Sequence, residues 1–181
     1  AVDPAMTNEK CDFWHFRLDA DTSMKMEALT SFMKDQPKVK NVFLINQNYS
    51  HGHQVAKYFK DAIVRKRPDV KVVGEDLHPI GQVKDFSPYV AKIKQANADT
   101  IVTGNWGQDL TLLVKAMNDA GLKIPMYTYY AGVTGTPTAL ASGGDSEVFV
   151  VAYGHANQKG EIGQMAADFK KKFNDDYYTY A

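Results

Sequence analysis

Short apolar runs alternate along this chain with amphipathic segments of helical length. Residues 42–45, 100–103 and 126–128 form such runs, and each leads through a polar loop into a segment with apolar residues at helical spacing. This alternation requires crossover connections and predicts a parallel sheet covered by helices on both faces. The carboxyl ends of the strands would then lie at one edge, where open α/β sheets bind ligands.

The pattern predicts an α/β fold, a three-layer sandwich around a mostly parallel sheet. We expect five strands in the order 2-1-3-4-5, an order that the alternation itself does not determine. The second strand mixes lysine with valine and is expected at an edge of the sheet, with a long loop over residues 74–86 after it. The first helix begins near Asp21, and its expected apolar face carries Met24, Ala28, Leu29, Phe32 and Met33. The strands are expected at 42–45, 70–73, 100–103, 126–128 and 148–152, and the later helices at about 53–67, 89–96, 110–120, 136–141 and 161–173.

Composition excludes some classes of function. The chain has 21 Lys and Arg against 21 Asp and Glu, so its net charge is zero, which argues against a nucleic-acid-binding surface. The sequence has no uninterrupted apolar run long enough to span a bilayer. Its single cysteine, Cys11, rules out an internal disulfide.

The 181 residues suffice for one domain of ordinary size. Residues 1–10 show no periodicity, and we interpret them as a cloning remnant or a disordered lead-in, with 11–181 as a single α/β unit, which the resemblance given below identifies as one ligand-binding lobe. The tyrosines at 177–180 stand in mid-pattern, so we expect a piece of a longer protein. The lack of a signal peptide here is then uninformative about export.

The sequence offers no motif for catalysis or for a nucleotide. Residues 132–136 lack the lysine of a P-loop, and no Gly-x-Gly-x-x-Gly follows a strand. His51 and His53 alone rarely suffice for a metal, and we expect them at a solvated helix N-terminus. Glu75 and Asp76 are expected to be loop carboxylates. We therefore expect no enzyme activity, no catalytic residue, no cofactor and no metal site.

Aromatic and polar side chains follow three of the expected strands. Flat apolar rings that carry a polar atom suit a small-molecule pocket at the edge of the sheet. We expect two of these rings to stack on a ligand, and the amide and the tyrosine hydroxyls to supply hydrogen bonds. Tyr127 depends on strand register, and we interpret it as a core residue. The predicted ligand-binding residues are Tyr49, Ser50, Asn105, Trp106, Tyr129 and Tyr130.

A resemblance to a known family runs from Phe13 to about Tyr178. It is carried by the segments VFLINQNYSHG (42–52), GQVKDF (81–86), ADTIVTG (98–104) and NDAGLK (118–123), and by the region 137–139. These segments are similar to type I periplasmic solute-binding proteins of branched-chain amino acid-type ABC transporters. The similarity covers most of the chain, which makes it more specific than any single motif.

The resemblance implies two lobes joined by hinge crossovers with the ligand between them, this chain being the second lobe. It further implies a non-catalytic protein of the periplasm that delivers a small solute, an amino acid or a related amide or aromatic acid, to ABC permease subunits in the inner membrane. From the charge balance we expect no nucleic-acid partner. By position, Tyr49 matches a tyrosine that commonly faces the ligand, and Asn105 and Trp106 match the loop after the third strand.

One departure from the family pattern bears on the ligand. Members that bind amino acids have an acidic residue in the loop after the fourth strand, whereas residues 128–132 contain none here. A buried ammonium without a partner is costly. The sequence therefore favours an amide, an aromatic acid or another uncharged or anionic solute over an α-amino acid.

Two alternatives remain open from the sequence. The first is a sensor domain of the same fold, fused to a receptor or a regulator. The second is an enzyme of flavodoxin-like architecture, which would require a convergent acid–base pair that the sequence does not indicate.

Overall fold

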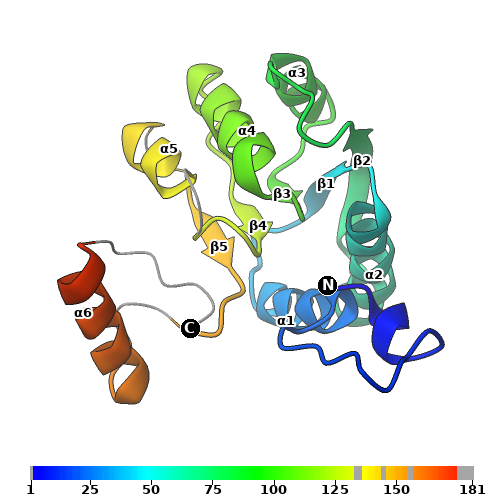
Figure 1. Cartoon of the computed structure of the whole chain (residues 1–181). Coiled ribbons are helices and arrows are strands. Elements are labelled where there is room, and N and C mark those ends of the chain that lie inside the picture. Colours follow the sequence, from blue (N-terminus) through cyan, green and yellow to red (C-terminus); the bar gives the residue numbers. More distant parts are fainter. Residues whose placement is uncertain (1, 133–135, 144–145, 155–156, 175–181) are drawn as a thin grey trace.

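The computed structural model describes residues 2–132, 136–143, 146–154 and 157–174. Within these ranges, five parallel strands form one sheet of order β2-β1-β3-β4-β5 (Figure 1). The predicted fold class and strand order are confirmed, including the place of the second strand at an edge. The strands are β1 (Asn41–Gln47), β2 (Lys71–His78), β3 (Thr100–Val102), β4 (Met126–Thr128) and β5 (Val148–Val150).

Helices cover both faces of the sheet. A 3-10 helix, η1 (Pro4–Thr7), precedes them. Helices α1 and α2 pack on one face, and α3, α4 and α5 pack on the other (Figure 1). The helices are α1 (Thr22–Lys34), α2 (Ser50–Lys66), α3 (Ser87–Gln95), α4 (Gly107–Asp119), α5 (Thr136–Gly143) and α6 (Glu161–Phe173).

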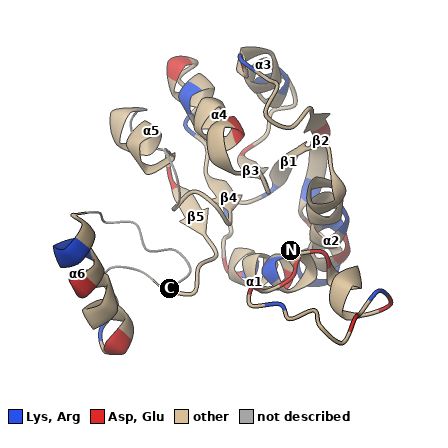
Figure 2. Cartoon of the chain, in the orientation of Figure 1, with Lys and Arg blue, Asp and Glu red and all other residues tan. Residues whose placement is uncertain are grey.

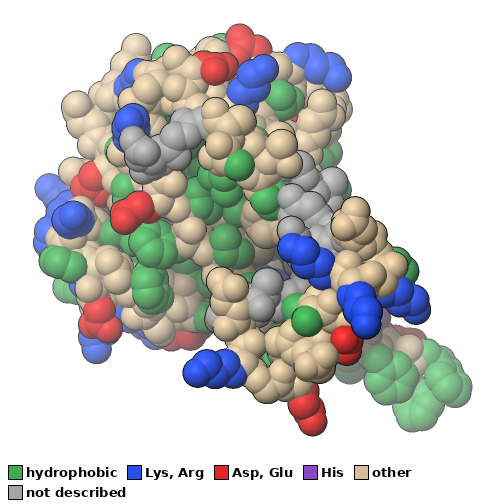
Figure 3. Space-filling model, turned by 90° about the vertical axis from the view of Figure 1, so that its left-hand side faces the viewer, with side chains coloured by type: hydrophobic (Ala, Val, Ile, Leu, Met, Phe, Trp, Pro, Cys, Tyr) green, Lys and Arg blue, Asp and Glu red, His purple; other side chains and the backbone are tan. Residues whose placement is uncertain are grey.

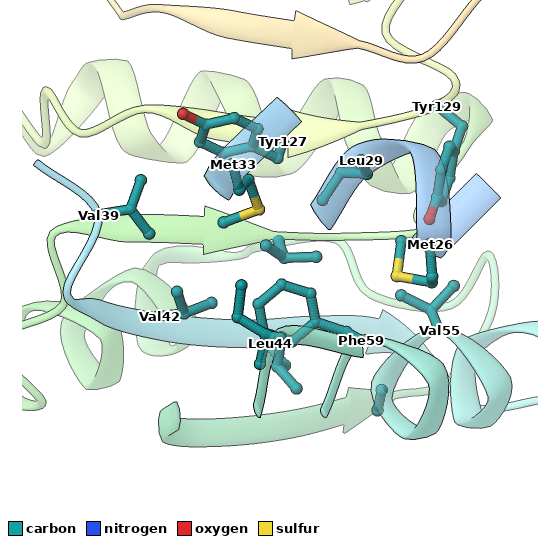
Figure 4. Packing of buried hydrophobic residues seen from close by; sticks show 13 residues of the cluster. Met26, Leu29, Met33, Val39, Val42, Leu44, Val55, Phe59, Tyr127 and Tyr129 are labelled. Carbon is teal, nitrogen blue, oxygen red and sulfur yellow. The ribbon is translucent and has the colours of Figure 1, made fainter. Parts of the chain in front are cut away.

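The sheet divides the apolar interior into two cores. Val42 and Leu44 of β1 pack with α1 and α2, and Figure 4 shows this core, with Met26, Leu29 and Phe59 around them. Phe43 and Ile45, which alternate with them along β1, belong to the second core with residues of α3 and α4. Because both of its faces are buried, β1 is apolar at every position from 42 to 45.

The buried face of α1 differs from the predicted one. Asp21 caps this helix as expected, since its Oδ1 accepts a hydrogen bond from the backbone N of Met24 at 3.0 Å. Met24 and Phe32, however, are 58% and 48% exposed. The face that packs against α2 is rotated about the helix axis away from these two residues. It includes Lys25, which a prediction based on apolar residues alone leaves out. The buried residues of α1 are Thr22, Lys25, Met26, Leu29, Thr30 and Met33.

Strand β2 is longer than predicted, and the expected loop over 74–86 is wrong in its first half. The strand runs to His78, which pairs with Gln47 at the end of β1. Glu75 and Asp76 lie within it instead of in a loop, and they accept hydrogen bonds from Lys60 at 2.8 Å and Lys92 at 2.9 Å. An edge strand accommodates such charges because its outer side is open to solvent.

Two segments flank the sheet and its helices and expose apolar side chains. Residues 11–18 carry the largely exposed Phe13, Trp14, Phe16 and Leu18, and α6 exposes Phe173. Helix α6 stands apart from the sheet in Figure 1. Figure 3 shows hydrophobic side chains gathered on the face of the molecule where β5 and α6 lie.

The first residues pack on the rest of the chain. The backbone N of Thr22 donates to the carbonyl of Val2 at 2.8 Å, and the guanidinium of Arg17 donates to the carbonyl of Asp3 and to the Thr7 hydroxyl. The assignment of residues 1–10 as a cloning remnant stays a prediction, as does that of 11–181 as one lobe.

Figure 2 shows charges of both signs on several helices and none on α5, whose sequence TPTALASG has no charged residue. In the part of the chain that the structure describes, no helix combines the length and the apolar character that crossing a membrane would need.

Candidate functional site

The loops that follow β1 and β3 meet at the carboxyl edge of the sheet. Tyr49 is the N-cap of α2 and Trp106 is the N-cap of α4, and both have extended backbones. The indole Nε1 of Trp106 donates a hydrogen bond to the hydroxyl of Tyr49 at 2.8 Å. Neither residue caps its helix with its side chain. The first turns of two helices therefore begin beside one aromatic pair.

The loop after β4 brings two further rings to the same place. The ring of His51 lies between them and Tyr49, with centroid distances of 5.9 Å to Tyr49, 6.0 Å to Tyr130 and 6.3 Å to Tyr129. Tyr129 and Tyr130 contact each other edge to face at 6.1 Å. We call Tyr49, Trp106, Tyr129 and Tyr130 the aromatic rim. The structure thus brings together four of the six predicted site residues.

The rings of the aromatic rim differ in exposure. Trp106 is 43% exposed, Tyr49 and Tyr130 are half-buried, and Tyr129 is buried. Burial raises the pKa of the Tyr49 hydroxyl, partly offset by the hydrogen bond from Trp106, and it raises that of Tyr129 well above its ordinary value. Both hydroxyls are therefore protonated at neutral pH and can donate hydrogen bonds.

His51 is buried, so its expected place at a solvated helix N-terminus is wrong. Its Nδ1 lies 2.9 Å from the hydroxyl oxygen of Thr22, and that hydroxyl donates its one proton to the carbonyl of Val2 at 3.0 Å. Nδ1 therefore carries a proton and donates it to Thr22. Burial, with a smaller contribution from Lys25, lowers the pKa of His51 to about 4, so the ring is neutral at neutral pH.

Asn105 lies beneath the aromatic rim. Its side chain is fully buried, and its Nδ2 is 2.8 Å from Nε2 of His78 at the end of β2. Its backbone N donates to the Thr103 hydroxyl at 3.0 Å. In this structure Asn105 supports the loop of Trp106 from below, and a direct contact with ligand stays a prediction.

A second buried contact joins the same loops. The carboxylate of Asp109 accepts hydrogen bonds from Gln47 Nε2 at 2.7 Å and from the backbone N of Gly81 at 2.9 Å. It thereby ties α4 to β1 and to the loop after β2. The Ser50 hydroxyl donates to Asp3 at 2.9 Å and accepts from Gln54 at 3.2 Å, so it is engaged within the chain. A role for Ser50 in binding stays a prediction.

Sequence reasoning missed His51 and Lys25, although spacing gave a usable signal for both. His51 precedes Val55 by four residues, and Val55 lies on the predicted buried face of its helix. Lys25 lies four residues before Leu29, on the buried face of α1. Both residues were missed because polar side chains were assumed to face solvent.

The rim combines ring faces with hydroxyl donors. Such a set can bind a small solute and offers no general acid–base pair among its four residues. Among the described residues, no three His, Cys, Asp or Glu side chains converge as metal ligands would.

The sequence matches the periplasmic binding protein family over residues 2–181. It is 36% identical to a Leu/Ile/Val-binding protein homolog 4 of Brucella melitensis, across 97% of this chain and 42% of the relative. The fold is similar to that of a leucine-, isoleucine-, valine-, threonine- and alanine-binding protein from Brucella ovis, at a TM-score of 0.84 and 32% identity over 98% of this chain and 46% of that one.

A solute-binding protein of an ABC transporter from R. palustris, solved in complex with benzoate, has the same TM-score of 0.84 at 19% identity and shares the fold. It is covered over 48% of its length, against 97% of this chain. The chain thus spans less than half the length of these relatives. The match to the family over nearly every residue agrees with the similarity of the fold to these structures, and the chain belongs to the periplasmic binding protein family.

Proposed function

We propose that this chain is one lobe of a two-lobed solute-binding protein of an ABC importer, and that the aromatic rim contacts the solute. The proposed protein is non-catalytic and lies in the periplasm. Its proposed partners are permease subunits in the inner membrane. The observation that carries the proposal is the hydrogen bond between Trp106 and Tyr49, at the edge where parallel sheets bind ligands. It fixes two ring faces from different loops in one place without a contribution from a ligand.

The exposed apolar side chains support a second lobe. Phe13, Trp14, Phe16 and Leu18 of one segment, and Phe173 of α6, are each more than half exposed. Several large apolar side chains exposed together along one short segment mark an interaction site. The relatives are more than twice as long as this chain, which leaves enough residues for another lobe there.

The ligand proposed is a small uncharged or anionic solute. Residues 128–132 contain no carboxylate to pair with an ammonium group. The Tyr49 hydroxyl accepts from Trp106 and keeps its own proton for a ligand acceptor. The first turn of α2, which has no side-chain cap and no acidic residue, adds the positive end of a helix dipole. An aromatic carboxylate meets these features better than an α-amino acid does.

Calorimetric titration tests the proposal with benzoate, benzamide, L-leucine and L-alanine. We expect the longer protein to bind benzoate or benzamide more tightly than either amino acid. This chain alone should bind each of them weakly, because a lobe that closes over the ligand is missing. Tighter binding of L-leucine than of benzoate would overturn the ligand class, and tight binding by this chain alone would overturn the two-lobed mechanism.

Tyr49→Phe in the longer protein tests the site itself. It removes the hydroxyl and leaves the ring, so we expect benzoate to bind about tenfold more weakly, as loss of one hydrogen bond to a charged group requires. Tyr58→Phe is the matched control, because Tyr58 is a partly buried tyrosine of α2 that packs on the first core. Equal affinities of the two variants would place the ligand elsewhere.

A further inference from the structure

Lys25 is a buried cation in an unfavourable place. It lies in the first turns of α1 and is 5% exposed, although the positive end of a helix dipole repels a cation. Its Nζ is 2.7 Å from Oδ1 of Asp19, which precedes the helix. A buried lysine is almost always paired, but the pair alone does not require this depth. Other contacts of Lys25 explain it.

Three tyrosine rings surround this ammonium group. Nζ of Lys25 lies 5.6 Å from the ring centroids of Tyr130 and Tyr153 and 5.7 Å from that of Tyr129. These distances fall within the range of cation–π attraction, which strengthens when the cation is desolvated. Two of the rings belong to the aromatic rim, and the third follows β5. The lysine therefore contacts the rim from the side of α1.

Asp19 connects this cation to the segment after β5. The hydroxyl of Tyr153 donates to Oδ1 of Asp19 at 2.5 Å, and the backbone N of Ala20 donates to the hydroxyl oxygen of Tyr153. The segment that enters α1 and the segment that leaves β5 are thus joined, although 134 positions separate the two residues. Asp19 bonds both this hydroxyl and the lysine beneath the rim.

We propose that Asp19, Lys25 and Tyr153 form a positioning cluster that sets the rings of Tyr129 and Tyr130 for ligand. The cluster does not touch the ligand and acts through those two rings. If the hydrogen bond between Tyr153 and Asp19 is lost, Asp19 shifts and the ammonium group of Lys25 follows it. The rings of Tyr129 and Tyr130, which pack on that group, then move as well. The proposal rests on the proposed function, in which these rings contact the solute.

The decisive experiment uses the chain without ligand. Tyrosine is labelled with 13C in the ring, and the signals of Tyr129 and Tyr130 are assigned from their phenylalanine variants. Tyr153→Phe should shift both signals, since it keeps the Tyr153 ring and removes the hydroxyl that bonds Asp19, whose carboxylate holds Lys25 between the rings. Tyr58→Phe is the control, because Lys57 lies 5.1 Å from the ring of Tyr58 in a separate lysine–tyrosine contact on α2. Unchanged signals in Tyr153→Phe would overturn the proposal.

A second arm measures benzoate affinity in the longer protein. Tyr153→Phe and Lys25→Met should each weaken binding by about fivefold or more, and Lys25→Arg should restore most of it because it keeps the cation. Lys57→Met, which removes a lysine paired with Asp61, should leave affinity unchanged. Failure of Lys25→Arg to restore affinity to a folded protein would contradict the cluster. If the wild-type protein binds no probe, the proposed ligand class fails, and the ring signals still decide the role of the cluster.

Discussion

Gly104 lies where a side chain has no room. A Cβ atom built on it would stand 2.7 Å from Cγ2 of Val55 and 3.1 Å from Nε2 of His51. Its backbone N donates to Oδ1 of Asn46 at 2.8 Å, which holds the loop after β3 close to β1. The loop that carries Trp106 thus lies against the buried face of α2 only because residue 104 lacks a side chain.

Gly104→Ala should lower the free energy of unfolding by about 1–3 kcal/mol, the range for overpacking a filled interior. Gly132→Ala is the control, because a Cβ there meets nothing within 4 Å and its backbone is not left-handed, so its effect should stay within about 0.5 kcal/mol. Urea denaturation of both variants measures the difference. Equal stabilities would show that α2 yields to the added methyl group.

His51 makes stability depend on pH. Its pKa is about 4 when folded and about 6.5 when unfolded, so between these values the unfolded chain binds more protons and stability rises with pH. The contribution is complete above pH 6.5 and is lost as the pH falls towards 4, amounting to about 3 kcal/mol.

His51→Gln should therefore reduce the gain in stability between pH 4 and pH 7, measured from urea unfolding curves at each pH. His53→Gln alters an exposed histidine two residues along the same helix and should leave the wild-type gain intact. A gain in His51→Gln as large as in the wild type would mean that His51 is not buried in its neutral form.

The candidate site was predictable only in part. The rings of Tyr49 and Trp106 could be placed from the sequence, because each follows an apolar strand directly and a parallel sheet fixes where strands end. The burial of Asn105 could not be placed in this way, since it depends on His78, whose strand was expected to end earlier. Contacts between loops distant in sequence have no local signal.

At the scale of the elements, one side chain caps the C-terminal end of α1. Arg67, just after α2, donates hydrogen bonds of 2.9 to 3.4 Å to carbonyls at the end of α1 and in the turn beyond it. The last carbonyls of a helix lack partners within the helix, and this guanidinium supplies them. The acceptors are the carbonyls of Met33, Lys34, Gln36 and Val39.

Arg67→Met should lower the free energy of unfolding by about 1–3 kcal/mol, since part-buried carbonyls lose their donors. Arg65→Met is the matched control on the same helix, because the side chain of Arg65 is mostly exposed and pairs with Glu27 at the surface, where an ion pair contributes less than about 1 kcal/mol. Thermal or urea unfolding separates the two. A larger loss for Arg65→Met would contradict this account.

Elements with a single strong signal were predicted well, and mixed ones were not. The apolar strand at 126–128 and the helix at 161–173 have the predicted bounds. Strand β2 was predicted too short because Gly74, Glu75 and Asp76 are poor strand formers. In the folded chain, Lys60 of α2 and Lys92 of α3 bind the two carboxylates and compensate for this. The buried face of α1 was rotated because the pattern weighed Met24 and Phe32 above a lysine.

At the scale of the whole molecule, alternation of strands and helices predicted the topology, because few chain paths satisfy it. Periodicity could not reveal the junction of Tyr153 with Asp19, which joins segments from opposite ends of the described chain. Nor could it tell that residues 11–18 lie outside the cores, since their aromatic residues look like core residues in sequence.

The support beneath the aromatic rim has an evolutionary consequence. Gln47, Asp109, Asn105 and His78 bind the loops to the sheet through buried hydrogen bonds below the rings. Tyr49, Trp106 and Tyr130 are partly exposed, so substitutions there leave these buried hydrogen bonds in place, whereas Tyr129 packs in the first core and its replacement would lower stability. Sequence change at these three outer positions is thereby separated from the hydrogen bonds that hold the loops on the sheet.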